Sequence, residues 1–167
     1  MSRSCDILLV DDNISDVKLA LHALGEQSQS GKVAVVRDGQ EALDFIFRRG
    51  KYTERMCSLP KFVLLDLKLP KVNGFEVLQA LKTDISTQAI PVIVFSSSNQ
   101  ECDLRESYRL GANSYVQKPV DFDAFTELIA RIKQYWLSVN NVPPLLADAR
   151  PTTGRAEVND DLGPQQS

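Results

Sequence analysis

The sequence lacks the long apolar segments that membrane-spanning and secreted proteins carry. No stretch reaches the roughly 18 consecutive apolar residues that a membrane-spanning helix needs. The first apolar run, at residues 7–10, is too short for the core of a signal peptide and ends at Asp11 and Asp12. We therefore predict a cytoplasmic protein that has no membrane partner.

Cysteine and histidine are also scarce. The three cysteines, Cys5, Cys57 and Cys102, are widely separated, which favours reduced thiols over a disulfide framework or a zinc site. The only histidine, His22, lies in a predicted helix, where a surface or packing role is expected. With 19 basic and 22 acidic residues the chain has a net charge of −3 and no basic block, so we expect no nucleic-acid partner.

What the sequence does contain is a buried strand that ends in a carboxylate. Residues 62–65 are apolar, Asp66 follows them, and Pro70 and Gly74 then signal a turn. A continuous apolar run of this kind is typical of a parallel strand that is covered on both faces. Ligands of open α/β sheets bind beyond the carboxyl ends of the strands, so Asp66 indicates a site at that edge.

Five such strands alternate with five helices along the chain. The strands are predicted at 6–10, 32–36, 62–66, 90–96 and 114–117, and the helices at 13–24, 38–47, 75–81, 99–110 and 121–139, with a polar surface loop at 50–61. This alternation predicts an α/β fold: a flavodoxin-like (βα)5 doubly wound parallel sheet with strand order 2-1-3-4-5.

The domain limits follow from composition. Hydrophobic residues make up 43% of the 167, which is enough for one domain with a real core. We predict this domain, with its C-terminal extension, over residues 1–147. Prolines and polar residues replace the periodic apolar pattern after that, which predicts a disordered tail over 148–167.

The predicted strand order places three carboxylates beside one another. The first and third strands are neighbours, so Asp11 and Asp12 come close to Asp66. Such carboxylates repel one another, and a divalent cation or raised pKa values relieve the repulsion. Oxygen ligands without imidazole or thiolate favour a hard ion, and we predict Mg²⁺. The simpler alternative is that Asp11 and Asp12 only cap the first helix.

Two further polar groups end strands at the same edge. Ser96 follows the fourth strand and Lys118 follows the fifth, and a hydroxyl with an ammonium group suits a phosphoryl group. A cis bond before Pro119 would hold the Lys118 loop in one shape. Attack of the Asp66 carboxylate on phosphorus, giving an acyl phosphate, fits this set. The chain has neither a GxxxxGK[ST] loop nor a GxGxxG fingerprint, so the phosphoryl donor must come from elsewhere.

With these residues the chain resembles the receiver domain of bacterial two-component response regulators over residues 5–138. The matching motifs are Asp11-Asp12, Asp66, the Leu69-Pro70…Gly74 turn, Pro91 leading to Ser96, and Tyr115-Val116-Gln117-Lys118-Pro119. The resemblance implies a non-enzymatic protein in which Asp66 accepts a phosphoryl group from a histidine kinase. It implies that Asp12, Asp66 and the backbone carbonyl of Lys68 bind Mg²⁺ with support from Asp11. It also implies that Ser96 and Lys118 contact the phosphoryl group.

The same resemblance implies how the signal leaves the domain. Ser96 moves toward the phosphoryl group and Tyr115 swings inward. The face made by the fourth helix, fifth strand and fifth helix then changes for protein interaction. Ser96 stands where threonine is commoner, which predicts slightly looser coupling, and the charged side chain of Lys68 borders the phosphorylation site.

Several segments are similar to the single-domain phytochrome-associated response regulators, namely residues 50–61, 96–101, 105–108, 111–115 and 135–137. This similarity implies a bacterial phytochrome kinase as the partner and a homodimer through the face of the fourth helix, fifth strand and fifth helix. Phe122, Phe125, Tyr135 and Trp136, with the extension at 143–146, offer apolar surface for that contact. The alternative is that these aromatic side chains only seal the domain's own core.

Two other functions are weighed against a phosphoacceptor. A phosphohydrolase with an aspartate nucleophile needs a cap domain and a general acid–base Asp two residues beyond Asp66, where Lys68 stands. A pseudo-receiver adaptor would act without phosphorylation, and the complete set of site residues speaks against it.

Overall fold

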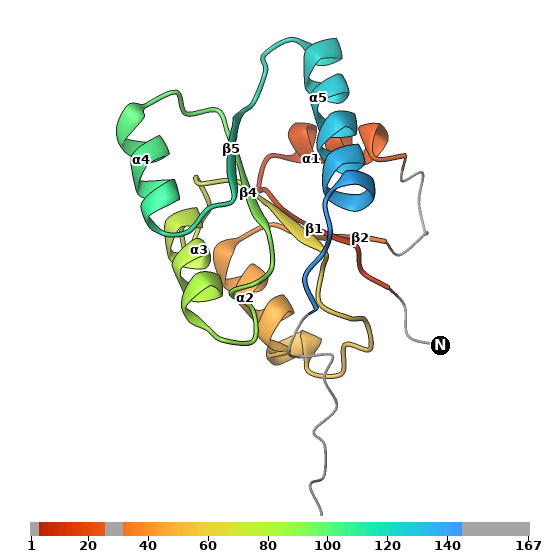
Figure 1. The fold of residues 1–167 in the computed structure, drawn as a ribbon, viewed down its shortest axis with the longest axis vertical. Coiled ribbons are helices and arrows are strands. Elements are labelled where there is room, and N and C mark those ends of the chain that lie inside the picture. The colour runs from red at the N-terminus through yellow and green to blue at the C-terminus, as the bar shows by residue number, and fades with distance from the viewer. Residues whose placement is uncertain (1–3, 26–31, 145–167) are drawn as a thin grey trace, which may run out of the picture.

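The chain folds around a five-stranded parallel sheet. A computed structural model describes residues 4–25 and 32–144, with the strands in the order β2-β1-β3-β4-β5 (Figure 1). The strands are β1 (Ile7–Val10), β2 (Val33–Val36), β3 (Phe62–Leu65), β4 (Val92–Ser96) and β5 (Ser114–Gln117). All neighbouring strands run parallel, so the predicted flavodoxin-like (βα)5 fold and its strand order are confirmed.

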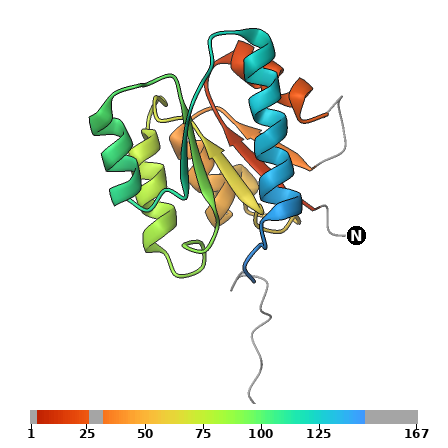
Figure 2. The same ribbon diagram turned by 45° about the horizontal axis from the view of Figure 1, so that its top comes forward.

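Helices cover both faces of this sheet (Figure 2). They are α1 (Ile14–Ala23), α2 (Gly39–Phe47), α3 (Gly74–Thr83), α4 (Glu101–Arg109) and α5 (Phe122–Gln134). Helices α1 and α5 lie side by side on one face, and α2 and α3 lie on the other, with α4 beside α3 and β5. Alternate strand residues serve the two faces: Ile7 and Leu9 pack on the α1 and α5 side, Leu8 and Val10 on the α2 and α3 side.

Four of these helices begin at a polar capping residue. The side chains of Asn13, Asp38, Asn73 and Asp121 each accept a hydrogen bond from a backbone N–H in the first turn of α1, α2, α3 and α5. The predicted helix 121–139 is α5 followed by a π-helical turn, Tyr135–Val139. The caps determine where each helix leaves the carboxyl edge of the sheet.

Gly74 allows α3 to begin directly against the end of β3. A Cβ atom at this position would lie 2.3 Å from the carbonyl oxygen of Asp66 and 2.5 Å from the Cα of Leu67, far inside contact distance. The N–H of Gly74 also donates to the Leu67 carbonyl at 2.9 Å. Glycine is therefore required here, and it keeps the loop after Asp66 close to the sheet edge.

Residues 50–61, predicted as a polar surface loop, are partly buried. They include a 3₁₀ turn, Gly50–Tyr52, and Leu59 is only 6% exposed. The ring of Tyr52 packs edge-on against Phe45, with 5.1 Å between the centroids. The loop therefore contributes to the core on the α2 side.

The remaining structural expectations concern thiols and chain limits. Cys5, Cys57 and Cys102 are free thiols, and His22 is exposed on α1. The domain predicted over 1–147 is described as far as Pro144, and the predicted tail at 148–167 lies outside the described residues. Within the described ranges, no helix combines the length and apolar character that crossing a bilayer requires.

Candidate functional site

Three carboxylates meet at the carboxyl edge of the sheet. Because β1 pairs with β3 in a register that places Val10 beside Leu65, the residues that follow these strands, Asp11 and Asp66, are neighbours. One carboxylate oxygen from each of Asp11, Asp12 and Asp66 lies within 4.8 Å of the others. Asp11 and Asp66 are buried, at 2% and 8% exposed, and Asp12 is exposed. The structure thus brings together three residues that the sequence predicted.

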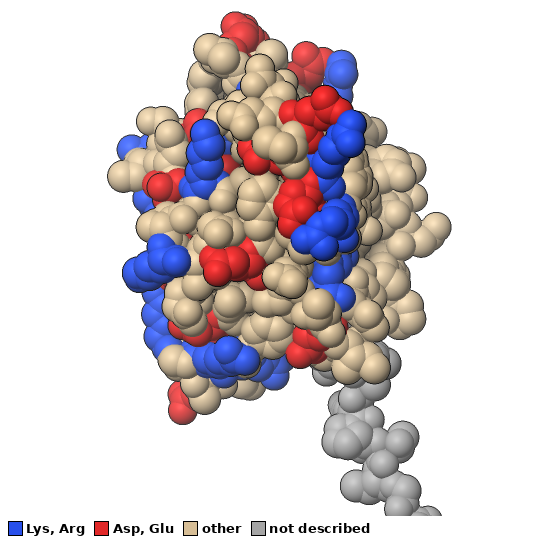
Figure 3. Space-filling model, turned by 90° about the vertical axis from the view of Figure 1, so that its left-hand side faces the viewer, with Lys and Arg blue, Asp and Glu red and all other residues tan. Residues whose placement is uncertain are grey.

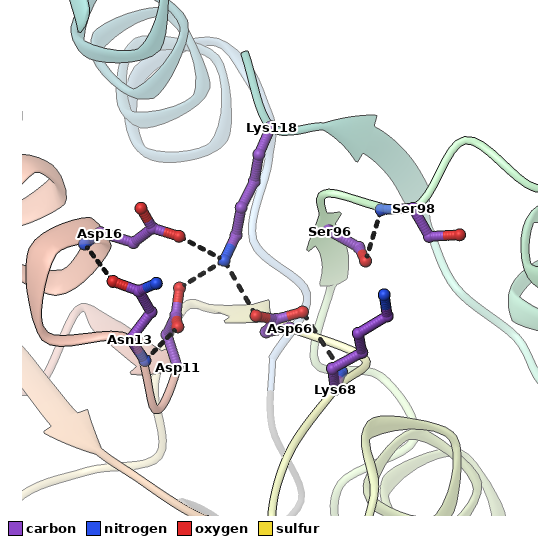
Figure 4. A network of polar contacts seen from close by, with 8 residues as sticks. All are labelled: Asp11, Asn13, Asp16, Asp66, Lys68, Ser96, Ser98 and Lys118. Carbon is purple, nitrogen blue, oxygen red and sulfur yellow. Dashed lines mark hydrogen bonds and ion pairs between the residues drawn. The ribbon is translucent and has the colours of Figure 1, made fainter. Parts of the chain in front are cut away.

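The ammonium group of Lys118 reaches into this cluster from the end of β5 (Figure 4). Its Nζ lies 2.8 Å from Asp11 Oδ2, 2.9 Å from Asp66 Oδ2 and 2.9 Å from Asp16 Oδ2. Only 7% of its side chain is exposed. A lysine ammonium has three N–H donors, so each has a carboxylate acceptor here. Lys118 is therefore the buried counter-ion of the acidic cluster.

Burial and charge act against each other in this cluster. Burial disfavours the ammonium form of Lys118, but the hydrogen bonds and charges of Asp66 and Asp11 outweigh it and raise the pKa of Lys118. Burial also raises the pKa of Asp11, against the effects of Lys118 and the Asn13 N–H. A buried carboxylate of this kind is stabilised by a further cation nearby.

Asp16, in the first turn of α1, joins the site without having been predicted from the sequence. Its side chain is 26% exposed and contacts Lys118. An acidic residue in the first turn of a helix is ordinarily explained by its favourable interaction with the helix dipole. The signal that could have found it is its position one turn after the Asp11-Asp12 pair, at the helix end that meets the same sheet edge.

The two predicted switch residues converge on the backbone of Ser98. Ser96 ends β4 and is fully buried, and its hydroxyl accepts a hydrogen bond from the Ser98 N–H at 3.2 Å. Figure 4 shows this hydroxyl facing the space beside Asp66. Tyr115 is half-buried on β5, and its hydroxyl donates to the Ser98 carbonyl at 3.1 Å. Burial raises the pKa of Tyr115, which keeps its hydroxyl protonated as a donor.

Lys68 contacts Asp66 through its backbone. Its N–H donates to Asp66 Oδ1 at 3.3 Å, and its side chain is exposed. The peptide bond before Pro119 is trans, so the cis bond considered from the sequence is wrong. The loop is held by other contacts, because the Lys118 N–H donates to the Ser96 carbonyl at 2.8 Å and the Lys118 side chain is paired with three carboxylates.

The donor atoms at this edge fit a hard divalent cation. Asp11, Asp12 and Asp66 supply only oxygen, the ligand atom that Mg²⁺ and Mn²⁺ prefer. Asp12 is the exposed member, which leaves one side open to the waters that such an ion keeps. The residues present are therefore compatible with the predicted cofactor.

Comparison with known protein families assigns the chain that carries this site to a family. The family described as "Response regulator receiver domain" matches residues 7–130, from β1 into α5. The chain belongs to this family. Receiver domains are signalling domains that bind a divalent metal, and the acidic cluster lies where such a metal fits.

Similar proteins share most of this receiver domain. FilR2 of Methanothrix harundinacea, described as a probable methanogenesis regulatory protein, is 42% identical over 137 residues, which cover 82% of this chain and 86% of FilR2. The structure of phosphorylated RcpA, a cyanobacterial phytochrome response regulator, has a TM-score of 0.78 at 37% identity and covers 84% of this chain and 99% of that one. The Mn²⁺-bound form of Rcp1, a response regulator of Synechocystis, has a TM-score of 0.76 at 32% identity with the same coverage. The predicted similarity to phytochrome-associated regulators is confirmed.

Proposed function

We propose that Asp66 accepts a phosphoryl group with the help of Mg²⁺ and that the protein passes this signal to a partner through its surface. The observation that supports this most is the position of Lys118 between Asp66 and Asp11. Its ammonium lies 2.9 Å from an Asp66 carboxylate oxygen, and only 7% of the lysine side chain is exposed. Charge that develops on an incoming phosphoryl group would therefore meet a fixed positive partner.

The reaction forms one bond and breaks one. A carboxylate oxygen of Asp66 attacks phosphorus, and the bond between phosphorus and the donor breaks, its electron pair leaving with the donor. Lys118 stays beside the phosphoryl oxygens, and the Ser96 hydroxyl donates to one of them. Mg²⁺, held by Asp12, Asp66 and the backbone carbonyl of Lys68 with support from Asp11, would neutralise charge on the carboxylates and the incoming oxygens.

The structure offers a route from this reaction to α4. The Ser96 hydroxyl accepts from the Ser98 N–H, and the Ser98 hydroxyl donates to Asp103 in the first turn of α4. If Ser96 turns toward a phosphoryl oxygen it releases the Ser98 N–H, and Tyr115, bonded to the Ser98 carbonyl, is affected as well. We propose that the α4-β5-α5 face is the signalling surface for this reason.

The proposed phosphoryl donor is a histidine kinase, and we favour a bacterial phytochrome kinase. RcpA and Rcp1, whose structures resemble this chain over 84% of its length, support this partner. FilR2, the probable methanogenesis regulatory protein, is 42% identical, so a histidine kinase of another signalling system is the alternative. Phosphotransfer assays against kinases of both types distinguish them. This role also assumes the cytoplasmic location predicted from the sequence.

A homodimer through the α4-β5-α5 face is part of the proposal. Of the aromatic residues predicted for it, Phe122 and Tyr135 are 53% and 49% exposed, whereas Phe125 is only 3% exposed and belongs to the core. Figure 3, which faces the side that carries α4, shows acidic and basic side chains mixed with uncharged ones. Such a mixture at the rim of an apolar patch can fix the register of two copies.

The dimer is tested by substituting its most exposed aromatic ring. Phe122→Ser should weaken self-association about tenfold or more, because it removes a large apolar anchor without opening the core. Light scattering over a concentration series measures this. Ile85→Ser, at a residue that is 70% exposed outside this face, is the matched control and should leave the dimer intact. A wild-type protein that stays monomeric at every concentration contradicts the dimer.

The phosphoacceptor is tested with a small donor. Acetyl phosphate with Mg²⁺ should add one phosphoryl group to the wild-type chain, and Asp66→Asn should abolish the addition because the amide is not a nucleophile. Intact-mass measurement, with and without a metal chelator, checks this. Labelling that persists in Asp66→Asn would assign the acceptor to another residue. A wild-type chain that accepts no phosphate from acetyl phosphate or any kinase would favour the pseudo-receiver adaptor.

Phosphohydrolase activity is less compatible with the site. Lys68 occupies the position where such an enzyme carries its general acid–base aspartate, and its side chain is an exposed cation. The described residues between β3 and α3 form only a short turn, with no inserted cap domain there. We therefore propose a signalling role without substrate turnover.

A further inference from the structure

Asp16 closes a ring of hydrogen bonds with Asp11, Asn13 and Lys118 (Figure 4). Asp11 Oδ1 accepts from the Asn13 N–H at 2.9 Å, and Asn13 Oδ1 accepts from the Asp16 N–H at 3.1 Å. Asp16 Oδ2 and Asp11 Oδ2 then accept from Lys118 Nζ, at 2.9 Å and 2.8 Å. The cap of α1 and the pairing of Lys118 are therefore one connected arrangement.

Asp16 differs from the other two partners of Lys118. Asp11 and Asp66 belong to the group of carboxylates spaced to hold a cation, and Asp16 does not. Under the proposed function, Asp66 becomes bonded to phosphorus and Asp11 supports the bound cation. Asp16 is therefore the one of these three carboxylates that binds neither phosphorus nor the cation and stays available to Lys118.

We propose that Asp16 is a positioning residue that holds the Lys118 ammonium beside Asp66 while the phosphoryl group arrives. This inference rests on the proposed function. The lysine stem has four flexible carbons and an ammonium without a preferred direction, so it needs an acceptor to orient it. With one donor bound to Asp16, the other two face Asp66 and the incoming oxygens. Misplacement of a stabilising charge by about 1 Å is enough to slow a reaction substantially.

The test separates positioning from metal binding. The rate of Asp66 phosphorylation by acetyl phosphate is measured by intact mass over a range of Mg²⁺ concentrations. At saturating Mg²⁺ we expect Asp16→Ala to be about tenfold slower than the wild type, because a misplaced charge stabilises the transition state less. Asp16→Asn, which keeps a neutral acceptor oxygen, should lose only about threefold. Asp123→Asn, which removes an exposed charge in the first turn of α5, is the matched control and should change nothing.

A second pair of variants shows whether Asp16 acts through Lys118. In a Lys118→Ala background, Asp16→Ala should cause no further loss of rate, because the group that it positions is already gone. The proposal is overturned if Asp16→Ala loses the same factor with and without Lys118. It is equally overturned if Asp16→Ala matches Asp123→Asn at saturating Mg²⁺.

A readout without phosphorylation keeps this inference separate from the proposed function. In metal-free protein, the side-chain ammonium signal of Lys118 in an NMR spectrum should be protected from exchange in the wild type and Asp123→Asn, and lost in Asp16→Ala. If the wild type accepts no phosphate but this pattern holds, the proposed function fails while the positioning of Lys118 stands. An unchanged signal in Asp16→Ala overturns the positioning whatever the phosphorylation assay shows.

Discussion

Two lysines, the buried Lys118 and the half-buried Lys82, lie at opposite ends of the sheet, and their surroundings differ. Lys118 lies at the carboxyl end among three carboxylates. Lys82, in the last turn of α3, lies near the amino ends of β4 and β5. It donates to the carbonyls of Gln88 and Ile90 at 3.1 Å and 2.8 Å and to Asn113 Oδ1 at 2.8 Å. One ammonium is matched by charge, and the other is only hydrogen-bonded.

The difference appears in the pKa values. At Lys118 burial is outweighed by the carboxylates and the pKa is raised, whereas at Lys82 burial lowers the pKa to about 8. Neutral acceptors satisfy the donors of Lys82 but do not compensate its charge. A lysine that is only hydrogen-bonded, as Lys82 is, has a structural role. A lysine surrounded by an excess of carboxylates, as Lys118 is, indicates a site that receives further cations.

The largest effect is expected from removing the charge at the carboxyl end. Lys118→Met leaves Asp11 and Asp66 buried without their counter-ion and should destabilise the metal-free protein by about 3 kcal/mol. Saturating Mg²⁺ should recover much of this loss, because it binds the folded cluster. Urea unfolding followed by the fluorescence of Trp136, with and without Mg²⁺, measures both effects.

Lys82→Met is the matched control for that experiment. It makes the same change of side chain, but the groups left behind are neutral acceptors. Asn113 Oδ1 also keeps its hydrogen bond from the Val92 N–H at 2.9 Å. We expect a loss of about 1 kcal/mol that does not respond to Mg²⁺. Equal losses in the two variants, or an equal response to Mg²⁺, would contradict the distinction between the two lysines.

The fold could be predicted because its signals are local. Apolar runs such as 7–10 and 62–65 end at acidic residues, and capping residues such as Asn13 and Asp121 precede periodic helices. The parallel order then follows from general rules of chain connection. Helical spacing could not say which aromatic ring faces solvent, so Phe122 and Phe125 looked equivalent although their exposed fractions are 53% and 3%.

The candidate site was predictable where a residue directly follows a strand. Asp11, Asp66 and Lys118 are such residues. Strand order makes Asp11 and Asp66 neighbours, and the long side chain of Lys118 reaches them from β5, past β4. Asp16 was missed because its contact with Lys118 depends on the direction of a side chain on a helix, which the order of the strands does not give. Lys82 was missed for the same reason, since its acceptors lie in loops that only the tertiary structure brings together.

The smallest expected effect is the pH dependence of stability that Lys82 causes and Lys118 does not. The unfolded chain binds a proton on Lys82 up to its ordinary pKa of 10.5, whereas the folded chain releases it near pH 8. The unfolded state therefore holds more protons between these values, and the free energy of unfolding should gain a contribution as pH rises from about 8 to 10.5. Lys118 contributes nothing in this window, because its raised pKa keeps it protonated in the folded state.

Asn113→Asp should remove that contribution. A carboxylate in place of the amide oxygen raises the pKa of Lys82, so its proton is retained across the window while the bond to the Val92 N–H is kept. The measurement is the urea midpoint of wild type, Asn113→Asp and Lys82→Met at several pH values, with the Lys82→Met curve subtracted to cancel all other titrating groups. A wild-type difference curve that is flat from pH 8 to 10.5 would show that Lys82 is not desolvated as its contacts imply. A rise that persists in Asn113→Asp would mean that charge matching does not separate the two lysines.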